Sequence, residues 1–127
     1  MSPRTRILIV EDQEEIAEIL GEIVQSLGHD VLFGPTLAQA VAKVKSDAPD
    51  VILLDVVLPD ARDTQGIDAL RAAGPATPII MVTANVDEDL GRELLKRGAF
   101  DYIMKPFDRN QLDRALTAAL GGSPQLD

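Results

Sequence analysis

The chain has 127 residues, of which 46% are hydrophobic and 26% are charged, and it contains no cysteine. This composition is typical of one globular domain with its own core, and it excludes disulfides and thiolate metal ligands. The formal net charge of −9 opposes contact with phosphate backbones, so we expect no direct nucleic-acid binding. The first apolar run, residues 7–10, is too short for a signal peptide or a membrane span. We therefore expect a soluble, cytoplasmic protein with no membrane partner.

Apolar runs and amphipathic stretches alternate through the first half of the chain. Residues 6–10 predict a buried strand, and the helix that follows is expected to end at Gly28. Its buried face is predicted from apolar side chains at helical spacing, namely Ile16, Ile19, Leu20, Ile23, Val24 and Leu27. Residues 31–33 predict a second strand. A second helix begins at Thr36, which forms a capping-box pattern with Gln39.

The second half of the chain continues this alternation. Strands are expected at residues 51–54, 78–82 and 102–104. A polar loop over residues 55–65 leads into a short helix that ends at Gly74. A further helix is predicted over residues 86–97, with Leu90, Leu94 and Leu95 buried. The last helix is expected to start at a capping box formed by Asp108 and Gln111. It is predicted to bury Leu112, Ala115, Leu116 and Leu120.

Five strand–helix units in strict alternation predict an α/β protein. Continuous apolar strands between helices indicate a doubly wound, five-stranded parallel sheet that five helices cover on both faces. The first, third and fourth strands are the most apolar, which favours the flavodoxin-like order 2-1-3-4-5. We expect residues 1–122 to form one domain and residues 123–127 to form a flexible C-terminal tail.

Residues with reactive side chains follow four of the predicted strands, at the edge where such sheets bind ligands. Glu11 and Asp12 follow the first strand, Asp55 the third, Thr83 the fourth and Lys105 the last. Clustered carboxylates need a counter-charge, and oxygen ligands without His or Cys favour Mg²⁺ or Mn²⁺. A cation and an ammonium group together would neutralise a transferring phosphoryl group. The central carboxylate, Asp55, is the best-placed nucleophile, and Thr83 could donate a hydrogen bond to a phosphoryl oxygen.

Each of these residues also has a simpler explanation when it is taken alone. Asp12 could cap the first helix in a capping box with Glu15, and Asp55 could bond its own turn. Lys105 could be a surface lysine, and Tyr102 an ordinary half-buried aromatic residue. These explanations are independent of one another, whereas the functional hypothesis requires all of the residues together in this order.

Four motifs resemble those of response-regulator receiver domains from two-component signalling. They are ILIVED at residues 7–12, LLDVVLP at 53–59, MVTAN at 81–85 and GAFDYIMKPF at 98–107. The resemblance extends from residue 7 to about residue 120. It implies a phosphorylation-dependent signalling switch that is not an ordinary enzyme, but that catalyses the transfer of a phosphoryl group to itself and slowly removes it again. The donor would be a phosphohistidine of a histidine kinase or phosphotransfer protein, or a small phosphodonor.

The resemblance also implies a role for each site residue. Asp55 would be the phosphoacceptor, and Lys105 would bind the phosphoryl group. Thr83 and Tyr102 would form the switch pair. The Lys105–Pro106 peptide would be cis. The ligands of Mg²⁺ would be the carboxylates of Glu11, Asp12 and Asp55 and the backbone carbonyl of Val57.

Phosphorylation is expected to alter the face made by the fourth helix, the last strand and the last helix. This face would contact an output partner that the sequence does not identify, and a phosphorylation-dependent dimer is compatible with it. The chain departs from the family pattern at Glu11, where Asp is more usual, at the apolar Val57 and in a longer loop at residues 60–65. That loop could reshape the access of the phosphodonor, although a tolerated surface segment is the expected alternative.

Three other functions can be weighed against the same residues. A flavin- or nucleotide-binding protein would need a Gly-rich or hydroxyl-rich loop after the first strand, where this chain has four acids in the five residues 11–15. A phosphohydrolase would need a second acid at the place of Val57. A pseudo-receiver, which binds partners without phosphorylation, stays open because of Glu11.

Overall fold

The computed structural model describes residues 5–62, 64–74, 76–84 and 88–121. Within these residues, strands and helices alternate strictly. The strands are β1 (Arg6–Val10), β2 (Asp30–Phe33), β3 (Val51–Leu54), β4 (Ile79–Thr83) and β5 (Asp101–Met104). The helices are α1 (Glu14–Ser26), α2 (Leu37–Asp47), α3 (Gln65–Ala73), α4 (Glu88–Lys96) and α5 (Arg109–Ala119).

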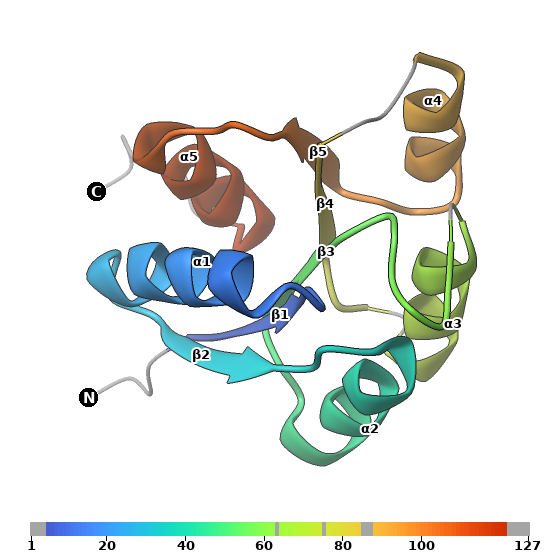
Figure 1. Cartoon of the computed structure of the whole chain (residues 1–127), viewed down its shortest axis with the longest axis horizontal. Helices are drawn as coiled ribbons and strands as arrows, with labels where there is room; N and C mark the ends of the chain where they lie inside the picture. The colour runs from blue at the N-terminus through green and yellow to red at the C-terminus, as the bar shows by residue number, and fades with distance from the viewer. Residues whose placement is uncertain (1–4, 63, 75, 85–87, 122–127) are drawn as a thin grey trace.

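The five strands form one parallel sheet in the order β2-β1-β3-β4-β5. Helices α1 and α5 lie on one face of the sheet, and α2, α3 and α4 lie on the other (Figure 1). This arrangement confirms the predicted doubly wound sheet and its strand order. It also places the carboxyl ends of β1, β3 and β4 side by side, which is where the candidate site lies.

Two apolar cores flank the sheet, because side chains alternate between its faces along each strand. One core includes Leu8, Ile52 and Met81 and packs under α2, α3 and α4. The other includes Leu53 and Ile80 and packs under α1 and α5. All residues of β3 and β4 are buried, as expected for central strands that are covered on both sides.

Local signals in the sequence mark several of the helix ends. Thr36 accepts a hydrogen bond from the backbone N–H of Gln39 at the start of α2, and Asp108 forms the predicted capping box at the start of α5. Gly28 and Gly98 follow α1 and α4 with φ of 98° and 104°, a left-handed conformation that glycine adopts without strain. The capping role considered for Asp12 is wrong, because Gln13 occupies the N-cap of α1, where its side chain makes no capping hydrogen bond.

Three leucine or isoleucine residues that were expected to be buried are exposed instead. Ile19 is 56% exposed, because it lies at the outer edge of the apolar stripe of α1. Leu95 is 43% exposed, since Leu94 beside it takes the inward position. Leu120 is 36% exposed and lies just beyond the end of α5. Residue 86, where the fourth helix was predicted to begin, and the predicted tail at residues 123–127 lie outside the described residues.

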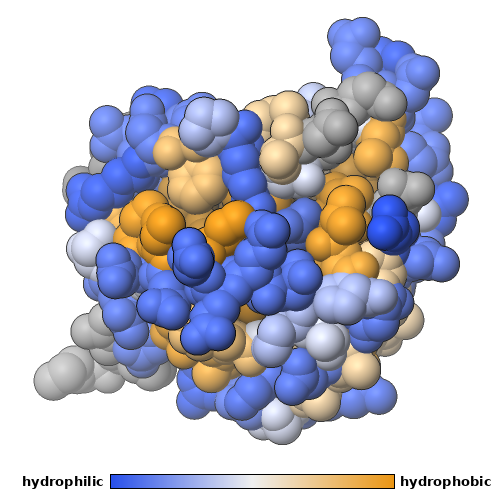
Figure 2. Space-filling model, viewed as in Figure 1, coloured by the Kyte–Doolittle hydropathy of each residue, from blue (hydrophilic) through white to orange (hydrophobic). Residues whose placement is uncertain are grey.

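Hydrophilic side chains cover most of the face seen in Figure 2, and apolar side chains show in patches between them. The large hydrophobic residues that are exposed over the whole described surface are Ile19, Phe33, Val57, Leu95, Phe100, Met104 and Leu120. In the described part of the chain, no helix has both the length and the apolar character needed to cross a membrane.

Gly34 marks a place where β2 and α2 approach closely. A Cβ atom at this position would lie 2.9 Å from the Cα atom of Ala40 and 3.0 Å from its backbone nitrogen. Backbone atoms cannot rotate away, so we expect Gly34→Ala to lower the free energy of unfolding by about 1–3 kcal/mol. Gly66→Ala is the matched control, because its Cβ would meet Leu54 at 3.4 Å, an ordinary contact. Urea denaturation of both variants checks this, and equal stabilities would contradict it.

Candidate functional site

Polar side chains from four strand ends gather at the carboxyl edge of the sheet. Glu11 and Asp12 follow β1, Asp55 follows β3, Thr83 ends β4 and Lys105 follows β5. All of them except Glu11 line one pocket of about 410 Å³. The structure therefore brings together the side chains that the sequence placed at separate strand ends.

Lys105 joins two of these acids. Its Nζ atom lies 2.8 Å from Oε1 of Glu11 and 3.3 Å from Oδ2 of Asp55. The Glu11 side chain is only 1% exposed, and those of Lys105 and Asp55 are 15% and 12% exposed. The Lys105–Pro106 peptide bond is cis, as the resemblance implied. A largely buried cation thus sits directly beside the predicted phosphoacceptor.

The Asp55 carboxylate is held at both oxygens. Its Oδ1 atom accepts a hydrogen bond of 3.1 Å from the backbone N–H of Val57, and Oδ2 faces Lys105. The backbone N–H of Asp55 donates to the carbonyl of Val10, so its backbone is anchored to β1. The Val57 side chain is 50% exposed and offers no polar group to the pocket.

Burial and charge shift the pKa values of the ion pair at this site. Burial is the main reason why the pKa of Glu11 lies above its usual value, although the hydrogen bond with Lys105 opposes that rise. Burial alone would lower the pKa of Lys105, but the hydrogen bonds and charges of Glu11 and Asp55 outweigh it and raise this pKa. Lys105 therefore remains an ammonium group at neutral pH, as binding a phosphoryl group requires.

Of the oxygen donors predicted for a divalent cation, Asp12, Asp55 and Val57 line the same pocket and Glu11 does not, so they form no closed set. Glu11 points to Lys105, whereas Asp12 is exposed at the pocket wall. Among the described residues, no group of three acidic or histidine side chains is arranged to hold a metal ion. Asp12, Asp55 and the carbonyl of Val57 still supply only oxygen. That donor set suits Mg²⁺, which usually keeps several waters and binds one or two carboxylates. The metal site stays a prediction.

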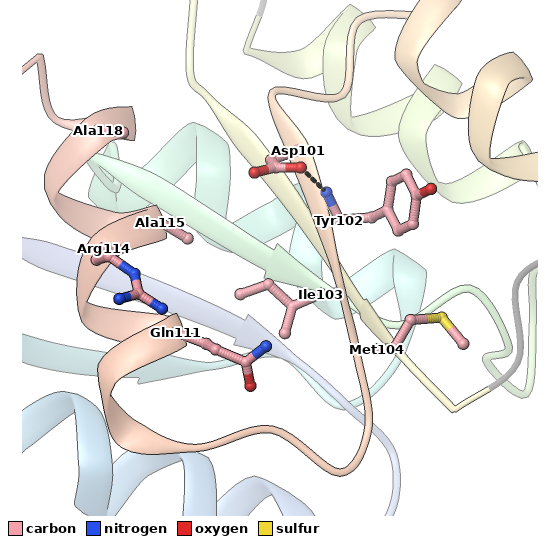
Figure 3. Close-up of a pocket in the computed structure, with 8 residues that line it drawn as sticks. All are labelled: Asp101, Tyr102, Ile103, Met104, Gln111, Arg114, Ala115 and Ala118. Atoms are coloured by element: carbon pink, nitrogen blue, oxygen red, sulfur yellow. Dashed lines mark hydrogen bonds between the residues drawn. The ribbon is translucent and has the colours of Figure 1, made fainter.

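Thr83 and Tyr102, the predicted switch pair, lie on the same face of the sheet. Thr83 pairs with Met104 and Met81 pairs with Tyr102, and side chains two residues apart on a strand share a face. Thr83 is buried at the pocket, while Tyr102 is half-buried against the core under α4. Figure 3 shows the Tyr102 side chain pointing away from α5. Their role as a switch remains a prediction.

Sequence reasoning missed a contact made by the loop after β3. The carboxylate of Asp60 accepts hydrogen bonds from the backbone N–H groups of Leu37 (2.8 Å) and Ala38 (3.1 Å), the first residues of α2. These N–H groups have no partner within the helix, so Asp60 caps α2 from a distant part of the chain. Thr36 already supplied a local cap in the sequence, and nothing in the pattern indicated a second cap 23 residues away.

The cap by Asp60 predicts a pH-dependent contribution to stability. The hydrogen bond from Leu37, followed by that from Ala38, lowers the pKa of Asp60 below its usual value. Because the folded pKa lies below the unfolded value of about 3.9, the stabilisation is fully present above that pH. It is lost as the pH falls through the folded pKa.

Asp60→Asn keeps an oxygen acceptor at this position but does not titrate. We expect its Tm to lie below that of the unmodified chain at neutral pH, and the gap to shrink once the pH falls below about 4. Thermal unfolding between neutral and acidic pH measures this gap. A gap that stays constant over the whole range would contradict the assignment.

Comparison with known proteins identifies the family. The model of the response regulator receiver domain matches residues 7–117. The chain belongs to this family. It is 39% identical over 122 residues to the DNA-binding response regulator MtrA of Mycobacterium tuberculosis, covering 92% of this chain and 51% of MtrA. It is 34% identical over 116 residues to the alkaline phosphatase synthesis transcriptional regulatory protein PhoP of Bacillus subtilis, covering 91% of this chain and 48% of PhoP.

Solved structures show the same fold. A response regulator receiver domain protein from Methanospirillum hungatei superposes with a TM-score of 0.87 at 28% identity, covering 94% of this chain and 95% of that one. The receiver described here spans about half the length of MtrA and PhoP. It is a signalling domain of two-component systems, whose general function is to accept a phosphoryl group, and such domains generally bind Mg²⁺ at the phosphorylation site.

Proposed function

We propose that this receiver is a switch that accepts a phosphoryl group on Asp55 from a phosphohistidine. The observation that carries the proposal is the pairing of Asp55 Oδ2 with Lys105 Nζ at 3.3 Å, in a pocket that Asp12 and Thr83 also line. A carboxylate nucleophile and a fixed cation stand together there. These are the groups that phosphoryl transfer needs for attack and for charge neutralisation.

In the proposed reaction, the phosphoryl group passes from the donor histidine to Asp55. One Oδ atom of Asp55 forms a bond to phosphorus while the bond from phosphorus to the donor imidazole nitrogen breaks, and that nitrogen takes up a proton. Lys105 stabilises the negative charge on the phosphoryl oxygens, and the backbone N–H of Val57 holds the carboxylate in place. Thr83, buried at the pocket wall, donates a hydrogen bond to a phosphoryl oxygen after transfer.

A divalent cation, Mg²⁺ or Mn²⁺, would supply further positive charge at this pocket when bound. Asp12, Asp55 and the backbone carbonyl of Val57 would hold it directly. Glu11, which Lys105 already binds, would contribute through a water molecule. These assignments agree with an all-oxygen site that keeps several waters.

The output proposed for this switch is the face made by α4, β5 and α5. Thr83 and Tyr102 share the sheet face beneath α4, so a movement of Thr83 toward a phosphoryl group leaves space that Tyr102 can fill. The donor would be a histidine kinase or a phosphotransfer protein in the cytoplasm. A dimer or an output partner would form on this face, and slow loss of the phosphoryl group would reset the receiver.

Intact-protein mass spectrometry tests the proposal. The protein is incubated with acetyl phosphate, once with Mg²⁺ and once with EDTA in excess. We expect the mass of one added phosphoryl group with Mg²⁺ and little or none with EDTA, because the remaining groups neutralise less of the transferring charge. An unchanged mass in both samples would refute phosphoryl acceptance, and equal gains would refute the role of the cation.

A pseudo-receiver that binds partners without phosphorylation is the second candidate. The ion pair between Glu11 and Lys105 favours it, because this pair engages one acid and the only cation that faces Asp55 among the described residues. The two candidates differ in the mass experiment, since a pseudo-receiver would gain no mass with acetyl phosphate and Mg²⁺.

A further inference from the structure

The ring of Tyr102 in β5 lies where a side chain on Gly91 of α4 would have to be placed. A Cβ atom built on Gly91 would lie 3.1 Å from Cζ, 3.2 Å from Cε1 and 3.2 Å from Oη of Tyr102. Carbon atoms at van der Waals contact are about 3.5–4.0 Å apart. The Tyr102 ring therefore occupies the space that a side chain at position 91 would need.

The backbone gives no other reason for glycine at this position. Gly91 lies inside α4, is buried and has no positive φ, unlike Gly28 and Gly98. Glycine destabilises the interior of a helix relative to alanine, so it carries a cost in α4. Gly91 leaves a notch in the surface of α4 that the ring of Tyr102 fills, and packing of the ring there offsets the loss of helix stability.

This notch faces the side of the sheet on which both residues of the proposed switch pair lie. Tyr102 is half-buried against the core under α4, on the face that it shares with Thr83. Its side chain points away from α5 and from the residues of α5 that line the groove beside β5 (Figure 3). The ring therefore packs on the side of β5 that α4 covers, next to position 91.

We propose that Gly91 is a positioning residue for Tyr102, which holds the ring against α4 and thereby sets how phosphorylation at Asp55 reaches the α4–β5–α5 face. The role of Gly91 in coupling rests on the proposed function, whereas its role in positioning the ring concerns the unphosphorylated chain alone. A side chain at position 91 fills the notch and displaces the ring toward solvent.

Tyrosine fluorescence reads the position of the ring directly, because the chain has one tyrosine and no tryptophan. Acrylamide quenching is measured for the unmodified chain, for Gly91→Ala and Gly91→Leu, and for the control Gly66→Ala. The control adds a methyl group to another helix at an ordinary contact distance of 3.4 Å.

We expect the quenching constant to rise from Gly to Ala to Leu at position 91. The rise reaches about two-fold in the leucine variant, because a half-buried ring that turns to another staggered rotamer becomes accessible. Gly66→Ala should match the unmodified chain. Quenching that stays equal in all four proteins would overturn the proposal.

A thermal double-mutant cycle gives an independent test, also if the leucine variant fails to fold. Gly91→Ala is compared in the unmodified chain and in a Tyr102→Ala background, where no ring occupies the notch. We expect the alanine to raise Tm more in the Tyr102→Ala background, because only the helix preference then acts. Equal changes in both backgrounds would show that residue 91 does not contact the ring.

Phosphorylation of Gly91→Ala and of the unmodified chain distinguishes a failure of this inference from a failure of the proposed function. With acetyl phosphate and Mg²⁺, Gly91→Ala should gain the same mass as the unmodified chain but lose the change in tyrosine fluorescence that accompanies it. If the unmodified chain gains no mass, the proposed function fails while the quenching series and the cycle still decide the role of Gly91. A full fluorescence change in Gly91→Ala would refute its part in coupling.

Discussion

Replacing Asp55 with asparagine is expected to abolish phosphoryl acceptance completely. The carboxamide keeps the shape of the side chain and can still accept the hydrogen bond from the backbone N–H of Val57. It is not a nucleophile of the kind that forms an acyl phosphate. Among the described residues, Asp55 is the one carboxylate that both lines the pocket and contacts Lys105. The measurement is the intact mass after incubation with acetyl phosphate and Mg²⁺.

The control for this experiment is Asp60→Asn, which changes an acid in the same loop. Asp60 faces the start of α2 rather than the pocket, so its variant should gain the full phosphoryl mass. A gain that survives Asp55→Asn would place the phosphoryl group elsewhere and contradict the assignment.

Replacing Lys105 with methionine is expected to have the next largest effect. Methionine keeps the length of the side chain but removes the charge beside Asp55. Losing one preorganised group that stabilises the transition state typically slows a reaction by about 10²–10³-fold. We expect a decrease of this size in the rate of mass gain. Lys96→Met, on the exposed surface of α4, is the matched control and should react at the normal rate.

The same variant also separates stability from reactivity. Without Lys105, the buried carboxylate of Glu11 loses its partner, and the free energy of unfolding should fall by on the order of 3 kcal/mol. The double variant Glu11→Gln with Lys105→Met contains neither charge, so its stability should recover while its phosphorylation stays slow. Recovery of the rate together with the stability would mean that Lys105 acts only through folding.

The sheet was predictable because its signals are local and repeated. Four-residue apolar runs such as residues 51–54 alternate with amphipathic helices, and a parallel sheet covered on both faces accounts for this pattern. Exposure at the helix edges was harder to predict. Ile19 and Leu95 have apolar side chains, but their burial depends on the width of the contact between helix and sheet, which periodicity does not fix.

The candidate site was predictable in its members but not in its contacts. Parallel topology alone brings Asp55 and Lys105 to one edge, so their proximity follows from their places after β3 and β5. The pairing of Lys105 with Glu11 depends on side-chain rotamers, and no spacing in the sequence encodes it. The contacts of Asp60 with α2 and of Tyr102 with Gly91 are equally non-local, which is why only the three-dimensional structure reveals them.

Chemical trapping of the phosphorylated residue tests the central claim most directly. The protein is phosphorylated with acetyl phosphate and Mg²⁺ and reduced with borohydride, which converts an aspartyl phosphate to homoserine, and its peptides are then sequenced by mass spectrometry. The account predicts homoserine at position 55 and unmodified residues at Asp12 and Asp60. Homoserine at another aspartate, or none at position 55 in protein that has gained the phosphoryl mass, would contradict it.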